Sequence, residues 1–188
     1  MLIDLSLSLT PDHYAQINQM AEREGHVGTH FDVMDKEFPI ESFKTQAKLV
    51  DISGIRGREI EVSDLSGFDF TDGDMAIFYT GYIEEYLYDS PDYYKKSAEL
   101  SDEAVAYLVS AGVRLIAVDA AGVQKPRKHQ AIDQYCADRN VFIVENVANL
   151  NRLRDAGVKT FTAYTAPLKR TGLTGLPCRL IAEVSAAI

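Results

Sequence analysis

The stretch His26-Val27-Gly28-Thr29-His30-Phe31-Asp32 decides how the rest of this chain is interpreted. It gathers two of the four histidines and a carboxylate within one short segment. Gly28 and Thr29 let the backbone fold tightly between the histidines, so that the three polar side chains converge while Phe31 points away and packs. Two neutral imidazoles and one carboxylate, with positions left for water, are typical of a catalytic site for a divalent metal.

The composition is that of an ordinary globular chain. Of 188 residues, 46% are hydrophobic and 25% charged, which predicts one domain over 1–188 with a substantial core. The formal net charge of −9 argues against nucleic acid and against an anionic membrane surface as partners. A small-molecule substrate, even an anionic one, suits a site that holds a dication. We therefore expect a small-molecule substrate and neither nucleic acid nor membrane.

The N-terminal segment and the cysteines favour a cytoplasmic protein. Met1-Leu2-Ile3-Asp4 lacks the basic residues of a signal peptide. No apolar run approaches the ~18 residues of a membrane-spanning helix. Cys136 and Cys178 have no CxxC partner, as expected of reduced thiols in the cytoplasm.

The hydrophobic pattern predicts an α/β fold. The first half is richer in strand patterns, at 2–7, 47–52, 59–62 and 75–79, with a helix expected from Thr10 to Arg23. The second half alternates helices, at 101–112, 127–139 and 150–156, with strands at 113–118, 141–144, 160–164 and 179–184. Between 79 and 94 the chain carries six tyrosines, which either line an aromatic substrate pocket or pack in the core.

The segment His26 to Asp32 resembles the signature His-x-Gly-Thr-His-x-Asp of the metal-dependent cyclase and kynurenine formamidase-like hydrolase family. The similarity extends over most of the chain. Further segments similar to that family are Ile3-Asp4-Leu5-Ser6, Asp74 to Gly81, Leu100 to Val118, Val144-Glu145-Asn146-Val147 and Pro167-Leu168-Lys169. The resemblance implies a single α/β domain with a mixed, barrel-like β-sheet and peripheral helices. It also implies a homo-oligomer, of two or more chains.

The resemblance implies the metal ligands as well. The residues that match the family's ligands are His26, His30, Asp32 and Glu145. Many members carry a further histidine 12 residues before that glutamate, where this chain has Asp133. His129 lies four residues earlier, on the same face of the expected helix. Asp133 keeps the position and His129 keeps the ligand type, so either residue can complete the site.

Lys36 stands where the family motif continues to an acid/base histidine. An imidazole suits proton transfer near neutral pH, whereas a lysine, with an ordinary pKa of about 10.4, is a charged donor. Lys36 is therefore predicted to orient an anionic substrate or to stabilise an oxyanion, and to act as a base only if its pKa is lowered. The alternative is a surface lysine without a role.

The motif predicts a metal-dependent hydrolase, and the resemblance implies an activity like that of arylformamidases. One or two Zn²⁺ or Mn²⁺ ions would lower the pKa of a bound water toward ~7, for attack on an amide, formamide, lactam or ester carbonyl. Glu145 would share in proton transfer, and Lys36 would assist at the oxyanion. Two alternatives remain. The first is a metal-binding relative without turnover, since Lys36 replaces the histidine, and the second is a metal-dependent lyase or cyclase acting on an enolate.

Overall fold

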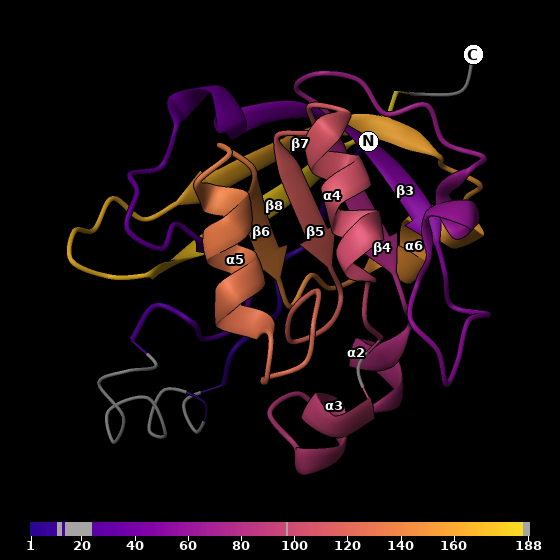
Figure 1. The fold of residues 1–188 in the computed structure, drawn as a ribbon, viewed down its shortest axis with the longest axis horizontal. Helices are drawn as coiled ribbons and strands as arrows, with labels where there is room; N and C mark the ends of the chain where they lie inside the picture. The colour runs from indigo at the N-terminus through magenta and orange to yellow at the C-terminus, as the bar shows by residue number, and fades with distance from the viewer. Residues whose placement is uncertain (11–12, 14–23, 97, 186–188) are drawn as a thin grey trace.

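The chain of the computed structural model closes into a seven-stranded barrel, described for residues 1–10, 13, 24–96 and 98–185 (Figure 1). The barrel strands are β2 (His30–Asp32), β3 (Lys44–Asp51), β4 (Met75–Tyr79), β5 (Leu115–Val118), β6 (Phe142–Glu145), β7 (Thr160–Pro167) and β8 (Gly175–Glu183). Around the ring their order is β8-β2-β6-β5-β4-β3-β7, and β7 pairs with β8 to close it. The short β1 (Leu2–Asp4) pairs with the C-terminal part of β8, whereas β2 pairs with its N-terminal part.

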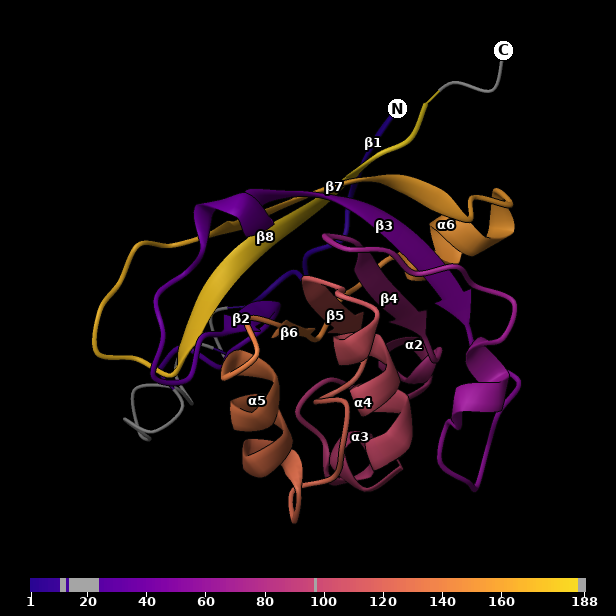
Figure 2. The same cartoon turned by 45° about the horizontal axis from the view of Figure 1, so that its top comes forward.

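The ring joins a parallel half to an antiparallel half. Strands β3 to β6 run parallel to one another, whereas β2, β7 and β8 form antiparallel pairs. Parallel neighbours need long crossovers, and α4 (Asp102–Ser110) and α5 (His129–Ala137) lie in two of them. Figure 2 shows both helices below β4, β5 and β6, with β3, β7 and β8 forming the opposite wall. The mixed, barrel-like sheet with peripheral helices is thereby confirmed.

Shorter helical segments complete the described chain. They are η2 (Ile40–Phe43), η3 (Val62–Leu65), α2 (Tyr82–Glu85), α3 (Pro91–Lys96) and α6 (Leu150–Asp155). In Figure 1, α2 and α3 lie together at the lower end of the molecule, below the barrel. The tyrosine-rich segment thus forms helical turns at one end of the barrel.

The alternation of side chains along the strands produces two apolar layers. Met75 and Ile77 pack with Phe31 in the barrel interior. Ala76 and Phe78 belong to a second layer, between the barrel wall and the helices. Because Phe31 faces inward, the residues before and after it on β2 face outward, toward α5.

Most predicted elements agree with the structure to within a few residues, with one exception. The strand predicted at 59–62 is wrong, because Ile60 makes only an isolated bridge to Leu100. The Glu61 N–H donates to the carboxylate of Asp64 at 2.8 Å, which begins the turn of η3 instead. The helix predicted from Thr10 to Arg23 falls mostly outside the described residues.

The two cysteines are free thiols, as predicted. Cys136 is a buried residue of α5, and Cys178 is half-buried on β8. Within the described part of the chain, no helix has both the length and the apolar character needed to cross a membrane.

Candidate metal centre

Strands β2 and β6 place three predicted ligands on the outer wall of the barrel. His30 lies directly opposite Glu145 in the antiparallel register, and Asp32 lies opposite Ile143. Alternate residues of a strand share a face, so these three polar side chains point away from the interior that Phe31 occupies. All three are buried.

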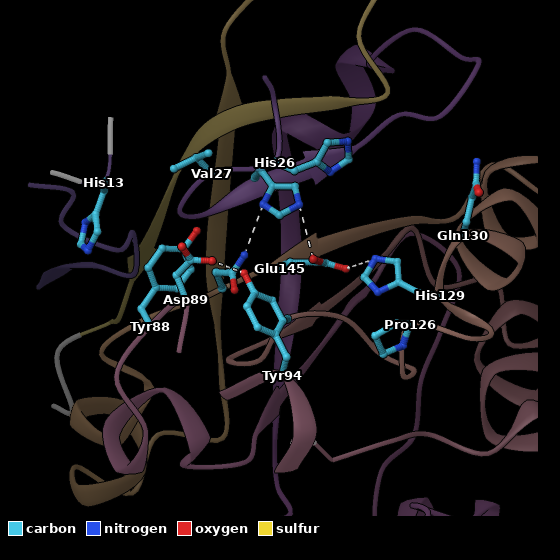
Figure 3. Close-up of a pocket in the computed structure, with 13 residues that line it drawn as sticks. His13, His26, Val27, Tyr88, Asp89, Tyr94, Pro126, His129, Gln130 and Glu145 are labelled. Carbon is cyan, nitrogen blue, oxygen red and sulfur yellow. Dashed lines mark hydrogen bonds and ion pairs between the residues drawn. The ribbon is translucent and has the colours of Figure 1, made fainter. Parts of the chain in front are cut away.

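Helix α5 supplies two more side chains from outside the wall. His129 and Asp133 share one face of α5 because four residues separate them. Nε2 of His129 lies 3.0 Å from Oε1 of Glu145 and 3.1 Å from Oδ2 of Asp133. Figure 3 shows His129 and Glu145 pointing toward each other. The structure therefore brings both of the alternative residues to the site.

His26 joins the cluster from the loop before β2. Its Nδ1 lies 3.0 Å from Oδ1 of Asp32, and its Nε2 lies 2.8 Å from the hydroxyl of Thr174. Its ring packs edge-on against the ring of His30, with 4.9 Å between centroids. The short motif therefore converges on one point, as predicted.

The ligand atoms form two groups, and within each group they lie no more than 4.8 Å apart. The histidine-rich group consists of His26, His30 and Asp32, and the carboxylate-rich group of Asp32, His129, Asp133 and Glu145. Asp32 belongs to both groups, so its carboxylate would be shared if each group held a cation.

Several buried polar atoms of these groups make no well-aligned hydrogen bond among the described residues, although ion pairs bring a histidine nitrogen to 3.0 Å from Oδ1 of Asp32 and from Oε1 of Glu145. They are Nε2 of His30, both carboxylate oxygens of Asp32, Oδ1 of Asp133 and Oε1 of Glu145. A buried polar group without a partner costs about 1–3 kcal/mol, and more when it is charged. Divalent cations bound between the two groups would satisfy all of these atoms. The residues present therefore fit a metal centre.

Two glycines leave the space that the outer histidine rings occupy. A Cβ atom at Gly122 would lie 2.6 Å from the ring of His129, and one at Gly175 would lie 2.6 Å from the ring of His26. Such contacts are too short for any carbon pair, so a side chain at either position would displace a histidine. The sequence alone did not indicate these glycines, because only the folded chain brings them against the histidines.

Asn146 helps to orient His30 through the carbonyl group of Gly28, which both side chains contact. Nδ1 of His30 contacts the carbonyl oxygen of Gly28 at 2.9 Å, which places the proton on Nδ1 and leaves Nε2 to bind a metal. The Asn146 amide donates to the same carbonyl at 3.0 Å, and the hydroxyl of Tyr93 donates to Oδ1 of Asn146 at 2.7 Å. These supporting residues were not predicted as site residues.

The carboxylates raise the pKa values of the inner histidines. Burial opposes protonation of His30, but Asp32 and Glu145 outweigh it, so the pKa of His30 lies well above its ordinary value. Burial likewise opposes protonation of His129, yet Glu145 above all raises its pKa to about 10. Although burial alone would raise the pKa of Asp32, the histidines hold it far below its usual range. Protonated histidines therefore supply, in the metal-free protein, the positive charge that the carboxylates require.

Lys36 lies apart from both groups. Its Nζ pairs with Asp138 at 2.9 Å and with Asp35 at 3.0 Å. Asp138 follows the last residue of α5, whereas His129 begins it, so about 13 Å of helix separates the two ends. The carboxylates of Asp138 and Asp35 raise the pKa of Lys36, the opposite of what a base requires. The geometry therefore does not support the catalytic role predicted for Lys36, because its ion pairs hold it at the far end of α5.

A cavity of about 350 Å³ opens onto the metal centre. Its walls include the ligands His26, His30, His129 and Glu145, and the aromatic or apolar residues Val27, Tyr88, Tyr94, Ala121 and Pro126. The hydroxyl of Tyr88 accepts a hydrogen bond from the N–H of Gly28 at 2.7 Å, and the hydroxyl of Tyr94 donates to Asp89. In Figure 3, Tyr88 and Asp89 lie across the cavity from His129 and Pro126.

The tyrosine-rich segment is therefore divided between two roles. Tyr88 and Tyr94 line the cavity, as one interpretation of the sequence required. Tyr93 is fully buried, and Tyr82 and Tyr86 stack on each other elsewhere, as the alternative required. The structure therefore places part of the segment at the cavity and packs the rest elsewhere.

A family model described as "Putative cyclase" matches residues 3–125, which is more than half of the chain. The chain belongs to the cyclase family. The resemblance inferred from the heptapeptide is thus confirmed for this cyclase-family protein. No curated protein sequence matches it.

Solved structures share the cyclase fold over nearly the whole chain. One, described as a potential metal-dependent hydrolase with cyclase activity, is 20% identical, with a TM-score of 0.76 and coverage of 97% of this chain and 96% of that one. A predicted metal-dependent hydrolase from Bacillus stearothermophilus is 19% identical, with a TM-score of 0.73 and 97% coverage of both chains. Isatin hydrolase A from Ralstonia solanacearum is 19% identical, with a TM-score of 0.75 and coverage of 98% and 92%.

Proposed function

We propose that this cyclase-family protein is a metal-dependent hydrolase that cleaves an amide, formamide, lactam or ester bond of a small molecule. The observation that carries the proposal is the pair of ligand groups joined at Asp32, beside a cavity large enough for a substrate. Proteins of the same fold include a predicted metal-dependent hydrolase and isatin hydrolases, and this similarity supports the choice of reaction.

Each of the two ligand groups would bind one cation. His26, His30 and Asp32 would hold one cation, and Asp32, His129 and Glu145, with Asp133, would hold a second. When bound, divalent cations lower the pKa of a coordinated water toward ~7 and polarise a carbonyl oxygen. The contact between His30 and the carbonyl of Gly28 fixes the ring, so that Nε2 is presented to the site without rearrangement.

Glu145 is the carboxylate best placed to move a proton. It lies on the wall of the cavity, 3.4 Å from Nε2 of His30 and 3.0 Å from Nε2 of His129. From there it can accept a proton from the attacking water and return it to the leaving nitrogen or oxygen. Lys36 has no part in this scheme.

The cavity favours a small, neutral, ring-bearing substrate. Its volume of about 350 Å³ is near the lower end of the range of about 300–1,000 Å³ that is typical of ligand sites. Tyr88 and Tyr94 offer aromatic surface, and no lysine or arginine is among the described residues that line it. An aryl amide or a lactam suits these walls better than a substrate that needs a basic side chain.

The metal, the cell compartment and the oligomeric state proposed for this protein rest on its ligand types, its cysteines and its exposed apolar side chains. Zn²⁺ or Mn²⁺ is the proposed cofactor, because histidine and carboxylate ligands suit both. The free thiols of Cys136 and Cys178 agree with the cytoplasm as the site of action. Exposed apolar side chains at Ile40, Phe43 and Leu168 are available for the proposed homo-oligomer.

The first experiment measures metal content and turnover in the same preparation. Protein purified without chelator is analysed by inductively coupled plasma mass spectrometry and assayed on lactams, formamides and esters, beside a His30→Ala variant. We expect stoichiometric metal and hydrolysis in the parent, and at least a 100-fold loss of turnover in the variant, since even supporting residues account for about 10–100-fold. Full turnover in a His26→Ala, His30→Ala double variant would contradict the proposal.

Isotope labelling separates hydrolysis from the alternatives. In ¹⁸O-labelled water, hydrolysis must place the label in the product, whereas a lyase or cyclisation reaction need not. Metal binding without turnover of any substrate class would favour the non-catalytic relative instead.

A further inference from the structure

The two ligand groups offer different kinds of atoms. The histidine-rich group presents two imidazole nitrogens and one carboxylate, whereas the carboxylate-rich group presents three carboxylates and one imidazole. Asp133 causes most of this difference, because it adds a third acid to a wall that already carries Asp32 and Glu145. Imidazole suits Zn²⁺, whereas carboxylate and water oxygens suit Mn²⁺ and Mg²⁺.

Burial makes this third carboxylate expensive unless a cation is bound. The side chain of Asp133 is 4% exposed, and those of Asp32 and Glu145 are 1% and 5% exposed. Oδ1 of Asp133 has no hydrogen-bonding partner among the described residues, and Oε1 of Glu145 faces Nε2 of His129 at 3.0 Å. Three acids buried around one histidine repel each other, and a bound dication removes that repulsion.

We propose that the carboxylate-rich group selects an oxygen-preferring dication, Mn²⁺ in particular, while the histidine-rich group takes Zn²⁺, so that the loaded protein holds two different metals. This inference rests on the proposed function only in that both groups bind cations. Zn²⁺ binds most sites more tightly than Mn²⁺, so the selectivity lies in the order of filling. The first equivalent of Zn²⁺ goes to His26 and His30, and Mn²⁺ supplied in excess occupies the other group.

The test loads metal-free protein with one equivalent of Zn²⁺ and excess Mn²⁺. After gel filtration, mass spectrometry counts both metals, and electron paramagnetic resonance reports bound Mn²⁺. We expect one Zn²⁺ and one Mn²⁺ per chain, and the Mn²⁺ spectrum of a single ion. Zn²⁺ is then added until half of the Mn²⁺ is displaced.

Substitutions on α5 locate the selectivity. Asp133→His converts the group toward nitrogen ligands, so we expect half-displacement of Mn²⁺ at about tenfold lower Zn²⁺ or less. Asp133→Asn keeps the size of the side chain and removes its charge, and it is expected to lower Mn²⁺ binding even if the histidine variant does not fold. Asp138→His, an exposed position just after the same helix, is the matched control and should leave the displacement curve unchanged.

Each result decides between the inference and the broader function. Zn²⁺ filling both groups of the parent protein from the first two equivalents, or an Asp133→His curve identical to that of the parent, would overturn the inference. Hydrolysis by a protein loaded with Zn²⁺ in both groups would leave the proposed function intact while the inference fails. The expected partition of Zn²⁺ and Mn²⁺ without hydrolysis of any substrate class would support the inference and contradict the proposed function. Absence of metal binding would contradict both.

Discussion

The histidine-rich and carboxylate-rich groups meet at Asp32 but are built in different ways. The first group comes from one loop and the strand that follows it, within seven consecutive residues. The second is assembled from β2, β6 and the helix α5, which are distant in the sequence. The difference teaches that a short motif defines half of this centre, whereas the barrel topology completes the other half. Substitutions of the shared residue Asp32, of residues beside one group, and of the residues that support His30 should therefore reduce metal binding by progressively smaller amounts.

Replacing the shared ligand should have the largest effect. Asp32→Asn removes the only carboxylate common to both groups, so we expect both metals to be lost and turnover to fall at least about 100-fold. Metal content by mass spectrometry and steady-state kinetics check this. Asp35→Asn, which changes an exposed carboxylate nearby, is the control and should retain both. Retention of two metals by Asp32→Asn would show that the groups are independent.

Two glycine substitutions should separate the groups. Gly122→Ala places a Cβ 2.6 Å from the ring of His129 and also strains a backbone with φ of +116°, so it should weaken the carboxylate-rich group. Gly175→Ala crowds His26 and should weaken only the histidine-rich group. We expect each to lower metal affinity at its own group by about 10–100-fold, measured by isothermal titration calorimetry.

The matched control for these variants is Gly54→Ala, because a Cβ there meets nothing within 4 Å. It should bind two metals as the parent does. Loss of the same metal from both Gly122→Ala and Gly175→Ala would contradict the division into two groups.

The sequence predicted the convergence of the histidine-rich residues fully and that of the carboxylate-rich residues in part, for physical reasons. His26, His30 and Asp32 are neighbours, so local backbone geometry is enough to bring them together. Whether His129 or Asp133 faces Glu145 depends on how α5 sits on the barrel wall, which is a tertiary property, and the structure brings both. The supporting glycines and Asn146 act only through contacts between distant segments.

The structure places Lys36 away from both ligand groups for a related reason. It lies four positions after Asp32, and its proximity in sequence suggested proximity to the metal. Strand β2 ends at Asp32, and Met34 adopts a φ of +55°, which turns the chain out of the strand. The ion pair with Asp138 then holds Lys36 at the far end of α5.

A change of pH should distinguish metal-free from metal-loaded protein. The pKa of His129 is about 10 in the folded state against an ordinary value of 6.5, so its protonation stabilises the metal-free fold below about pH 6.5. That stabilisation is lost as pH rises toward 10. A cation must displace the proton, so the increase in Tm on adding Mn²⁺ should grow from pH 6 to pH 8.5. Thermal unfolding with and without Mn²⁺ checks this, and a Tm increase that does not depend on pH would contradict it.

Substitution of Tyr93, which supports His30 through Asn146, should have the smallest effect on metal binding. Tyr93→Phe removes the hydroxyl that donates to Asn146 and leaves a buried acceptor without its partner, at a cost of about 1–3 kcal/mol in unfolding free energy. Asn146 still holds the carbonyl of Gly28, so metal affinity at the histidine-rich group should fall by less than about tenfold. Urea unfolding and calorimetry measure the two quantities. Tyr86→Phe, whose hydroxyl bonds only an exposed glutamate in the described structure, should change neither. A larger loss of metal affinity than of stability in Tyr93→Phe would mean that the hydroxyl fixes the orientation of His30, and that the histidine-rich group depends on distant contacts after all.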